Sequence, residues 1–153
     1  MRGSGPEAIL YLDLACPHCA ATWARIRELE LRLVFRHFPV SSKHPRAPAL
    51  HAAAEAAGLQ GSFWQMCDSL YLDQGHIDDP HLWDRARDFE LDVERFERDR
   101  RSDTVAERVR SDFQSGIRAG VTGTPAAYVS GRLIASGVER EVAALVDQPR
   151  GDR

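Results

Sequence analysis

The order of apolar and polar residues predicts strands at the two ends of the chain and helices between them. The apolar run at residues 9–12 is typical of a buried strand. Residues 31–39 alternate apolar and polar side chains and end at Pro39, which predicts a second strand. Residues 20–29 have helical spacing, with Pro17 in the first turn, where no backbone donor is lost. We therefore expect a strand–helix–strand unit with parallel strands and a right-handed crossover.

Helical patterning fills the middle of the chain. The predicted helices cover residues 47–57, 62–72, 79–89, 92–96 and 103–119. The last three open on an aspartate (Asp79, Asp92 and Asp103), a residue type that caps free N–H groups. Gly120 ends the last of them. Residues from about 47 to 119 are therefore predicted to be an all-helical insertion.

Strand patterning returns after the insertion. Residues 126–130 and 132–135 predict two short strands, and Gly131 between them predicts an antiparallel hairpin. Residues 138–146 predict a last helix. The whole order is β-α-β, helices, then β-β-α, which is the arrangement of the thioredoxin fold. We predict one α/β domain over residues 1–153, a thioredoxin fold with an inserted all-helical subdomain.

Composition excludes several classes of protein. A net charge of −3 gives no reason to expect a nucleic-acid partner. Two of the three cysteines lie in one motif, so a framework of disulfides is not expected. No apolar run approaches the ~20 residues that span a bilayer. Residues 1–6 are polar and do not resemble a signal peptide, which predicts a cytoplasmic protein. A trimmed N-terminus would leave the periplasm or cell envelope as the alternative.

Cys16-Pro17-His18-Cys19 is the segment with the most specific chemistry. It lies where the first strand ends and the first helix begins. Free N–H groups and the helix dipole favour an anion there, and such settings lower the pKa of a cysteine to roughly 3.5–7.5. We expect Cys16 to be exposed and acidic and Cys19 to be the buried resolving thiol. His18 adds positive charge or a hydrogen bond to the Cys16 sulfur. Two cysteines that only pack, or half of a zinc site, are the alternatives.

The chain resembles the DsbA-like thioredoxin-fold family of thiol-disulfide oxidoreductases. The resemblance rests on residues 13–19, Arg36-His37-Phe38-Pro39, His44-Pro45, residues 61–64, and residues 120–125 with Gly131. It implies that Cys16 is the nucleophile, Cys19 resolves the mixed disulfide and His18 tunes the thiolate. It also implies that Pro125 follows a cis bond, so that Thr124 presents its backbone to an extended substrate. Similar domains occur as exported proteins, as cytoplasmic proteins and attached to sodium/proton antiporters.

Other residues with reactive side chains have less specific signals. Asp13, three residues before Cys16, is either a proton acceptor for Cys19 or a polar residue that ends the strand. Cys67 lies among apolar residues and is expected to be a buried, inert thiol, with a regulatory disulfide as the alternative. The even spacing of His37, His44 and His51 places them in a strand, a loop and a helix. That spacing is therefore expected to have no structural meaning, and no metal site is predicted.

These residues predict a thiol-disulfide oxidoreductase that needs no cofactor. Its Cys16–Cys19 disulfide would pass to protein dithiols, and a redox partner would then reset the two cysteines. Three alternatives use the same fold. They are a reductase or isomerase, a glutathione-dependent enzyme, and a redox sensor or binding module without turnover.

Overall fold

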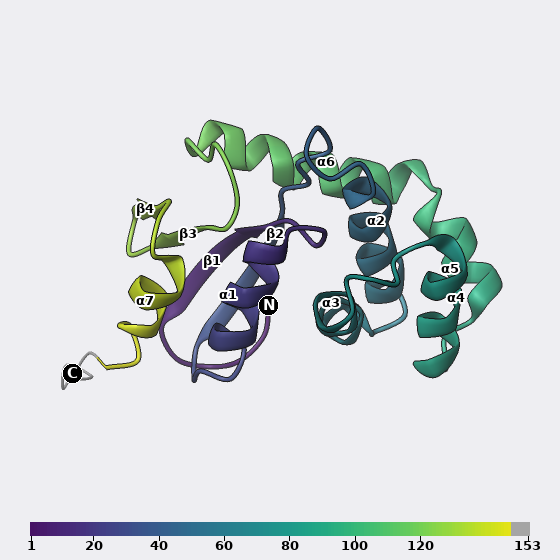
Figure 1. Cartoon of the computed structure of the whole chain (residues 1–153), viewed down its shortest axis with the longest axis horizontal. Helices are drawn as coiled ribbons and strands as arrows, with labels where there is room; N and C mark the ends of the chain where they lie inside the picture. Colours follow the sequence, from purple (N-terminus) through teal and green to yellow (C-terminus); the bar gives the residue numbers. More distant parts are fainter. Residues whose placement is uncertain (148–153) are drawn as a thin grey trace.

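One mixed four-stranded sheet organises residues 1–147, the part of the chain that the computed structural model describes (Figure 1). The strand order is β2-β1-β3-β4. The central strand β1 (Glu7–Leu12) pairs in parallel with β2 (Arg32–His37) and antiparallel with β3 (Ala126–Val129). β4 (Arg132–Ile134) pairs antiparallel with β3 at the edge. This is the predicted thioredoxin arrangement.

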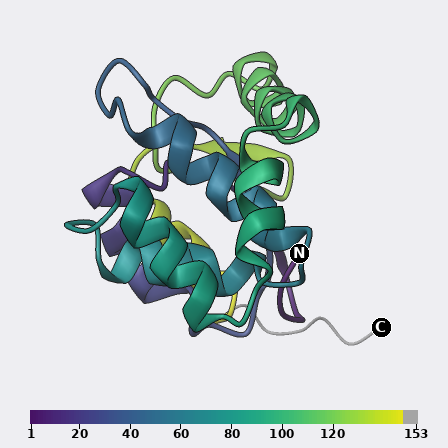
Figure 2. The ribbon, with the colours of Figure 1, turned by 90° about the vertical axis from the view of Figure 1, so that its right-hand side faces the viewer.

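In the part of the chain that the structure describes, seven helices surround and extend the sheet. They are α1 (Pro17–Ile26), α2 (Ala47–Gly58), α3 (Phe63–Leu72), α4 (Asp79–Asp88), α5 (Val93–Arg100), α6 (Asp103–Arg118) and α7 (Val138–Ala143). Helices α1 and α7 pack together on one side of the sheet. Helices α2 to α5 form the inserted helical body, which faces the viewer in Figure 2. The long helix α6 lies along both parts and leads the chain back to the sheet (Figure 1).

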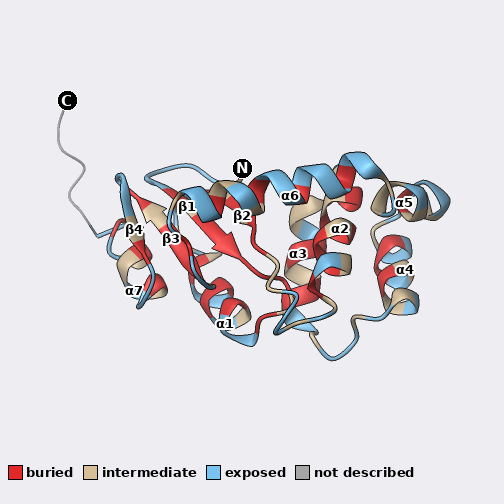
Figure 3. Cartoon of the chain, turned by 90° about the horizontal axis from the view of Figure 1, so that it is seen from above, coloured by how far each residue is buried: buried red, intermediate tan, exposed pale blue. Residues whose placement is uncertain are grey.

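The two faces of β1 belong to two apolar clusters, because successive side chains of a strand point to opposite faces. Leu10 and Leu12 are fully buried in the main core. Tyr11 points the other way, against Phe38, which in turn stacks on Phe113 of α6 with ring centroids 4.5 Å apart. Figure 3 shows the buried strands beneath a helix α6 whose outer side is exposed. The end of β1 is therefore held from both faces.

The helix boundaries differ slightly from those that the pattern predicts. Ser102, and not Asp103, caps α6, because the Ser102 backbone is extended and its hydroxyl accepts the Val105 N–H at 3.2 Å. Helix α4 begins at Asp79, as predicted, and Asp78 before it caps the helix by accepting the His81 N–H. Helix α5 continues to Arg100, four residues beyond the predicted end, and α7 ends at Ala143. The element order is unaffected.

Two short features complete the sheet. Ser130 and Gly131 both have positive φ (49° and 76°), as a tight hairpin turn between twisted strands requires. At the opposite edge, Arg2 forms an isolated antiparallel bridge to Leu33 of β2. The polar residues before β1 thus cover part of the edge of β2.

Within residues 1–147, no helix combines the length and the apolar character needed to cross a membrane.

Candidate active site

The two cysteines of the predicted motif lie at the N-terminus of α1, directly after β1. Cys16 is the N-cap residue and Pro17 the first helical residue, as expected. The backbone N–H of Cys19 donates to the Cys16 Sγ at 3.4 Å. All three cysteines of the chain are free thiols. Cys16 is only 7% exposed, so it is less accessible than predicted, while Cys19 is fully buried.

The surroundings of Cys16 stabilise its thiolate. A hydrogen bond from the Cys19 thiol is the main cause, and backbone N–H groups of Cys19 and His18 and the Thr124 hydroxyl contribute. Partial burial opposes them, and the pKa of Cys16 falls to about 5. Cys16 is therefore ionised at neutral pH, as the reactive form of a cysteine must be.

The surroundings of Cys19 have the opposite effect. Burial, together with the hydrogen bond that its thiol gives to Cys16, raises the pKa of Cys19 far above its ordinary value. The backbone N–H of Asp13 donates to the Cys19 Sγ at 3.5 Å. One thiol is thus poised as an anion and the other as a proton donor, which is the division of roles predicted for the pair.

His18 and Thr124 both contribute to the acidity of Cys16. His18 lowers the pKa of Cys16 through a hydrogen bond from its backbone N–H, and its side chain is exposed. Thr124 contributes its side-chain hydroxyl, and the contact of its backbone with substrate stays a prediction. The Thr124–Pro125 peptide bond is cis. His18, Thr124 and Pro125 line a pocket of about 190 Å³ beside the motif.

Asp13 is fully buried at the end of β1, and its carboxylate closes a turn. One oxygen accepts the Ala15 N–H at 2.9 Å and the other accepts the Val40 N–H at 2.9 Å. Burial alone would raise the pKa of Asp13, but the neighbouring His51 ring and these N–H groups lower it below its ordinary value. The structural role that the sequence left open is therefore present.

The inserted helices hold the turn that carries the cysteines. The Tyr71 hydroxyl donates to the carbonyl oxygen of Asp13 at 3.1 Å. The Gln74 amide donates to the carbonyl oxygens of Leu14 and Cys16, each at 3.2 Å. Neither residue was predicted to belong to the site, because contacts across 58 and 60 residues leave no local signal. The carbonyls of Asp13 and Cys16 also accept the backbone N–H groups of Cys16 and Ala20, so the insertion adds a second donor to each of them.

The histidine spacing that was expected to have no structural meaning does bring two of the three histidines together. The Nδ1 atoms of His37 and His51 lie 2.7 Å apart. The prediction was wrong because the end of β2 packs against α2, which brings the two rings edge to face. His44 stays in the connecting loop. In the described part of the chain, no group of three or more His, Cys, Asp or Glu side chains is placed to bind a metal.

Cys67 is fully buried, as predicted. Burial raises its pKa well above the ordinary value, with the charges of Asp68 and Glu55 as further causes. A buried thiol of this kind is inert towards oxidation and exchange.

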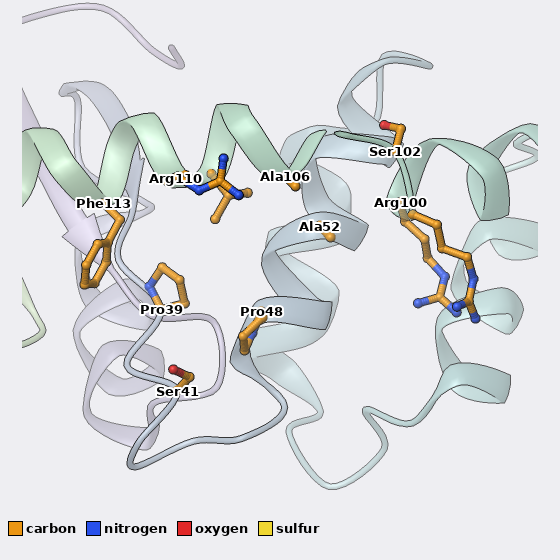
Figure 4. Close-up of a pocket in the computed structure, with 11 residues that line it drawn as sticks. Pro39, Ser41, Pro48, Ala52, Arg100, Ser102, Ala106, Arg110 and Phe113 are labelled. Atoms are coloured by element: carbon orange, nitrogen blue, oxygen red, sulfur yellow. The ribbon is translucent and has the colours of Figure 1, made fainter. Parts of the chain in front are cut away.

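A larger cavity of about 360 Å³ lies away from the cysteines, between α6 and the segment after β2. Figure 4 shows Phe113 and Arg110 from α6 on one side of it and Pro39 and Pro48 on the other. Neither residues 16–19 nor Thr124 and Pro125 line this cavity.

The fold and the site together define the class of protein to which the chain belongs. The sheet order, the helical insertion and two cysteines at the first turn of α1 are those of thioredoxin-fold proteins with a Cys-x-x-Cys site. The family described as DSBA-like thioredoxin domain matches residues 8–145, so the chain belongs to that family.

Solved structures agree with the fold of this family. A thioredoxin-like oxidoreductase from Silicibacter pomeroyi superposes with a TM-score of 0.81 at 23% identity, covering 94% of this chain and 86% of that chain. The thiol-disulfide exchange protein alpha-DsbA2 from Wolbachia pipientis gives 0.79 at 19% identity, covering 95% and 84%. At these identities the likeness shows the fold.

The curated relatives carry a different kind of name. Na(+)/H(+) antiporter NhaA 1 from Salinispora arenicola is 35% identical over 136 residues, which are 86% of this chain and 21% of that protein. The antiporter NhaA from Herminiimonas arsenicoxydans is also 35% identical, over 95% of this chain and 25% of its own length. The chain thus spans a quarter or less of these relatives.

Proposed function

We propose that the protein is a thiol-disulfide oxidoreductase that oxidises protein dithiols. A substrate thiolate attacks the Cys16 sulfur of the Cys16–Cys19 disulfide, and Cys19 leaves and takes up a proton. The second substrate thiolate then attacks the substrate sulfur of this mixed disulfide. The substrate leaves with a disulfide, and the enzyme retains the Cys16 thiolate and the Cys19 thiol. A redox partner must afterwards remove two electrons from the enzyme.

The single observation that carries the proposal is the opposite shift of the two thiols. The low pKa of Cys16 makes it a good leaving group and nucleophile, and the high pKa of Cys19 keeps it protonated until it is needed. Stabilising the Cys16 thiolate also stabilises the reduced protein, which makes the disulfide more oxidising. Thr124 and Pro125 beside Cys16 are proposed to bind the extended substrate.

Trapping tests the proposed roles. Cys19→Ser should hold substrates as mixed disulfides on Cys16, and these should run as adducts on non-reducing gels. Cys16→Ser should form none, and it is the matched control because it also retains one thiol of the pair. Equal trapping by the two variants would contradict the assignment of nucleophile and resolving thiol.

The equilibrium reduction potential tests the direction of the reaction. It is measured in glutathione buffers, with the thiols counted at each ratio. A reduction potential well above that of the glutathione pool in the cytosol supports an oxidase and an oxidising compartment such as the periplasm or cell envelope. A reduction potential at or below that of the cytosolic glutathione pool supports a reductase in the cytoplasm. Each ~30 mV corresponds to about 1.4 kcal/mol for this two-electron couple.

A further inference from the structure

A buried arginine of the insertion, Arg85 on α4, holds the loop that follows α3. Arg85 is only 7% exposed. Its guanidinium donates to the Ser69 hydroxyl at 2.8 Å. It also donates to the carbonyl oxygens of Asp73 and His76, at 3.0 and 2.6 Å. Longer hydrogen bonds join it to the carbonyl oxygens of Ser69 and His81. Within residues 1–147, the hydrogen-bond acceptors of Arg85 are thus all uncharged oxygens.

Arg85 compensates for its burial by capping the end of α3. Burial lowers the pKa of Arg85, and the charges of Asp73 and Asp88 oppose that shift. Helix α3 ends at Leu72, and the last carbonyl groups of a helix have no partner within it. These groups also form the negative end of the helix dipole, which favours a cation. The guanidinium therefore stabilises the end of α3 together with the loop that leaves it.

Gln74 lies in the sequence between the two loop carbonyls that Arg85 holds. Its side-chain amide donates to the carbonyl oxygens of Leu14 and Cys16 in the turn that carries the cysteines. The Cys16 carbonyl also accepts a backbone N–H of α1. The Leu14 carbonyl has Gln74 as its donor in the part of the chain that the structure describes. The position of this turn therefore depends on the position of Gln74.

The position of the turn decides whether the Cys16 sulfur meets Thr124. The backbone N–H groups of His18 and Cys19, which donate to that sulfur, belong to the same helical turn as Cys16 and move with it. The Thr124 hydroxyl belongs to the loop before β3, on a distant part of the chain. A turn that rotates about Leu14 would therefore keep the two backbone donors and lose the hydroxyl.

Resting on the function proposed above, we propose that Arg85 is a positioning residue of the active site that acts through Gln74. Arg85 fixes the loop after α3, and the loop places the Gln74 amide against the turn. The turn in turn keeps the Cys16 sulfur within hydrogen-bond distance of the Thr124 hydroxyl. The helical insertion thereby helps to set the acidity of the nucleophile, although Arg85 itself lies two segments away from it.

Arg85→Met tests this role, because methionine keeps an apolar stem and removes every donor. The reduced protein is alkylated with iodoacetamide over a series of pH values, and modification at Cys16 is confirmed by mass. Cys19 and Cys67 are buried with raised pKa values, so they do not compete. The midpoint of about 5 expected for the unmodified protein should rise. We expect a rise of about 0.4 to 1 pH unit, the effect of one lost hydrogen bond, and a similar rise in Gln74→Met.

The double variant Arg85→Met/Gln74→Met shows whether Arg85 acts through Gln74. If it does, the double variant has the same midpoint as Gln74→Met alone, because no amide is left for Arg85 to position. Two rises that add would overturn the proposed path. If Arg85→Met does not fold, Arg85→Lys takes its place in the comparison, since lysine keeps the cation and loses the planar fork of donors.

Arg100→Met is the matched control for loosening of the insertion. Arg100 on α5 is also buried, with 6% of its side chain exposed, and it pairs with Asp79 and Glu97. Its loss should lower the free energy of unfolding in urea and leave the midpoint of Cys16 unchanged. An equal rise in Arg100→Met would overturn the inference, and so would an unchanged midpoint in Arg85→Met. Arg85 would then only stabilise the insertion, and the proposed function would still stand.

The unmodified protein provides the separate test of the proposed function. A midpoint near the ordinary value of 9.0 would show that Cys16 is not an activated thiol. The proposed function would then fail, and the positioning role of Arg85 would fail with it.

Discussion

Tyr71 of the helical insertion donates a 3.1 Å hydrogen bond to the carbonyl oxygen of Asp13, the last residue before the turn that carries the cysteines. The same carbonyl also accepts the backbone N–H of Cys16 at 3.2 Å, so the buried Tyr71 hydroxyl adds a second donor to it from the insertion. The insertion is therefore part of the support of the active-site turn.

Removing this hydroxyl should destabilise the protein without disturbing the packing of the ring. In Tyr71→Phe the ring still packs against Trp23, at 6.2 Å between centroids, while the Asp13 carbonyl loses one of its two donors and keeps the Cys16 N–H. We expect the free energy of unfolding in urea to fall by about 0.5–1.5 kcal/mol, the net contribution of one hydrogen bond. Tyr71→Leu, which also removes the ring, should cost more. A Tyr71→Phe protein as stable as the original would contradict this role.

The Thr124 hydroxyl should help to set the acidity of Cys16. The rate of iodoacetamide alkylation at Cys16 should rise with pH around a midpoint of about 5. Thr124→Val keeps the shape of the side chain and removes the donor to the thiolate. The midpoint should therefore rise by up to about one pH unit, since a hydrogen bond contributes about 1 kcal/mol and one pKa unit is 1.36 kcal/mol. A midpoint that does not move would exclude the hydroxyl as a donor.

The stability of the reduced protein should depend on pH through Cys16. Its pKa falls on folding from 9.0 to about 5, so the unfolded state binds more protons between these values. The stabilisation is complete above about pH 9 and disappears as pH falls through 5, with a slope of about 1.4 kcal/mol per pH unit.

The oxidised protein is the control for this prediction, because its disulfide cannot ionise. The two forms should therefore differ in slope when each is unfolded in urea at pH 5, 6 and 7. His51 acts equally in both forms, and the raised pKa values of Cys19 and Cys67 matter only above this range. Parallel slopes would show that Cys16 is not ionised in the folded protein.

Gly116 of α6 should resist substitution although alanine favours helices. An added Cβ would lie 2.8 Å from the Phe38 ring and 3.0 Å from the Tyr11 ring. Gly116→Ala should thus destabilise the protein by about 1–3 kcal/mol through overpacking. Ser111→Ala, at an exposed position of the same helix, should be neutral or slightly stabilising in the same urea titration. A stable Gly116→Ala protein would show that α6 can shift away from the sheet.

The sequence pattern was sufficient to predict the helices and strands, their order and the two reactive cysteines. Strand alternation, caps and turn residues are local signals, and Cys16 and Cys19 form a local motif. The contacts that complete the site are not local. Tyr71 and Gln74 reach the turn from the insertion, and His37 meets His51 only because β2 packs on α2. Side chains repeat every two residues in a strand and every 3.6 residues in a helix. Polar residues on a strand and on a helix therefore share no spacing in the sequence that would reveal such contacts.

The strand order also constrains how the protein is made. Ile9 in β1 pairs with Val34 on one side and with Tyr128 on the other. During synthesis, β1, α1 and β2 can associate early, because they are close in sequence. The other edge of β1 can pair only after β3 has been made, when almost the whole chain is complete. A nascent chain therefore presents its cysteines beside an open sheet edge before Thr124 has emerged.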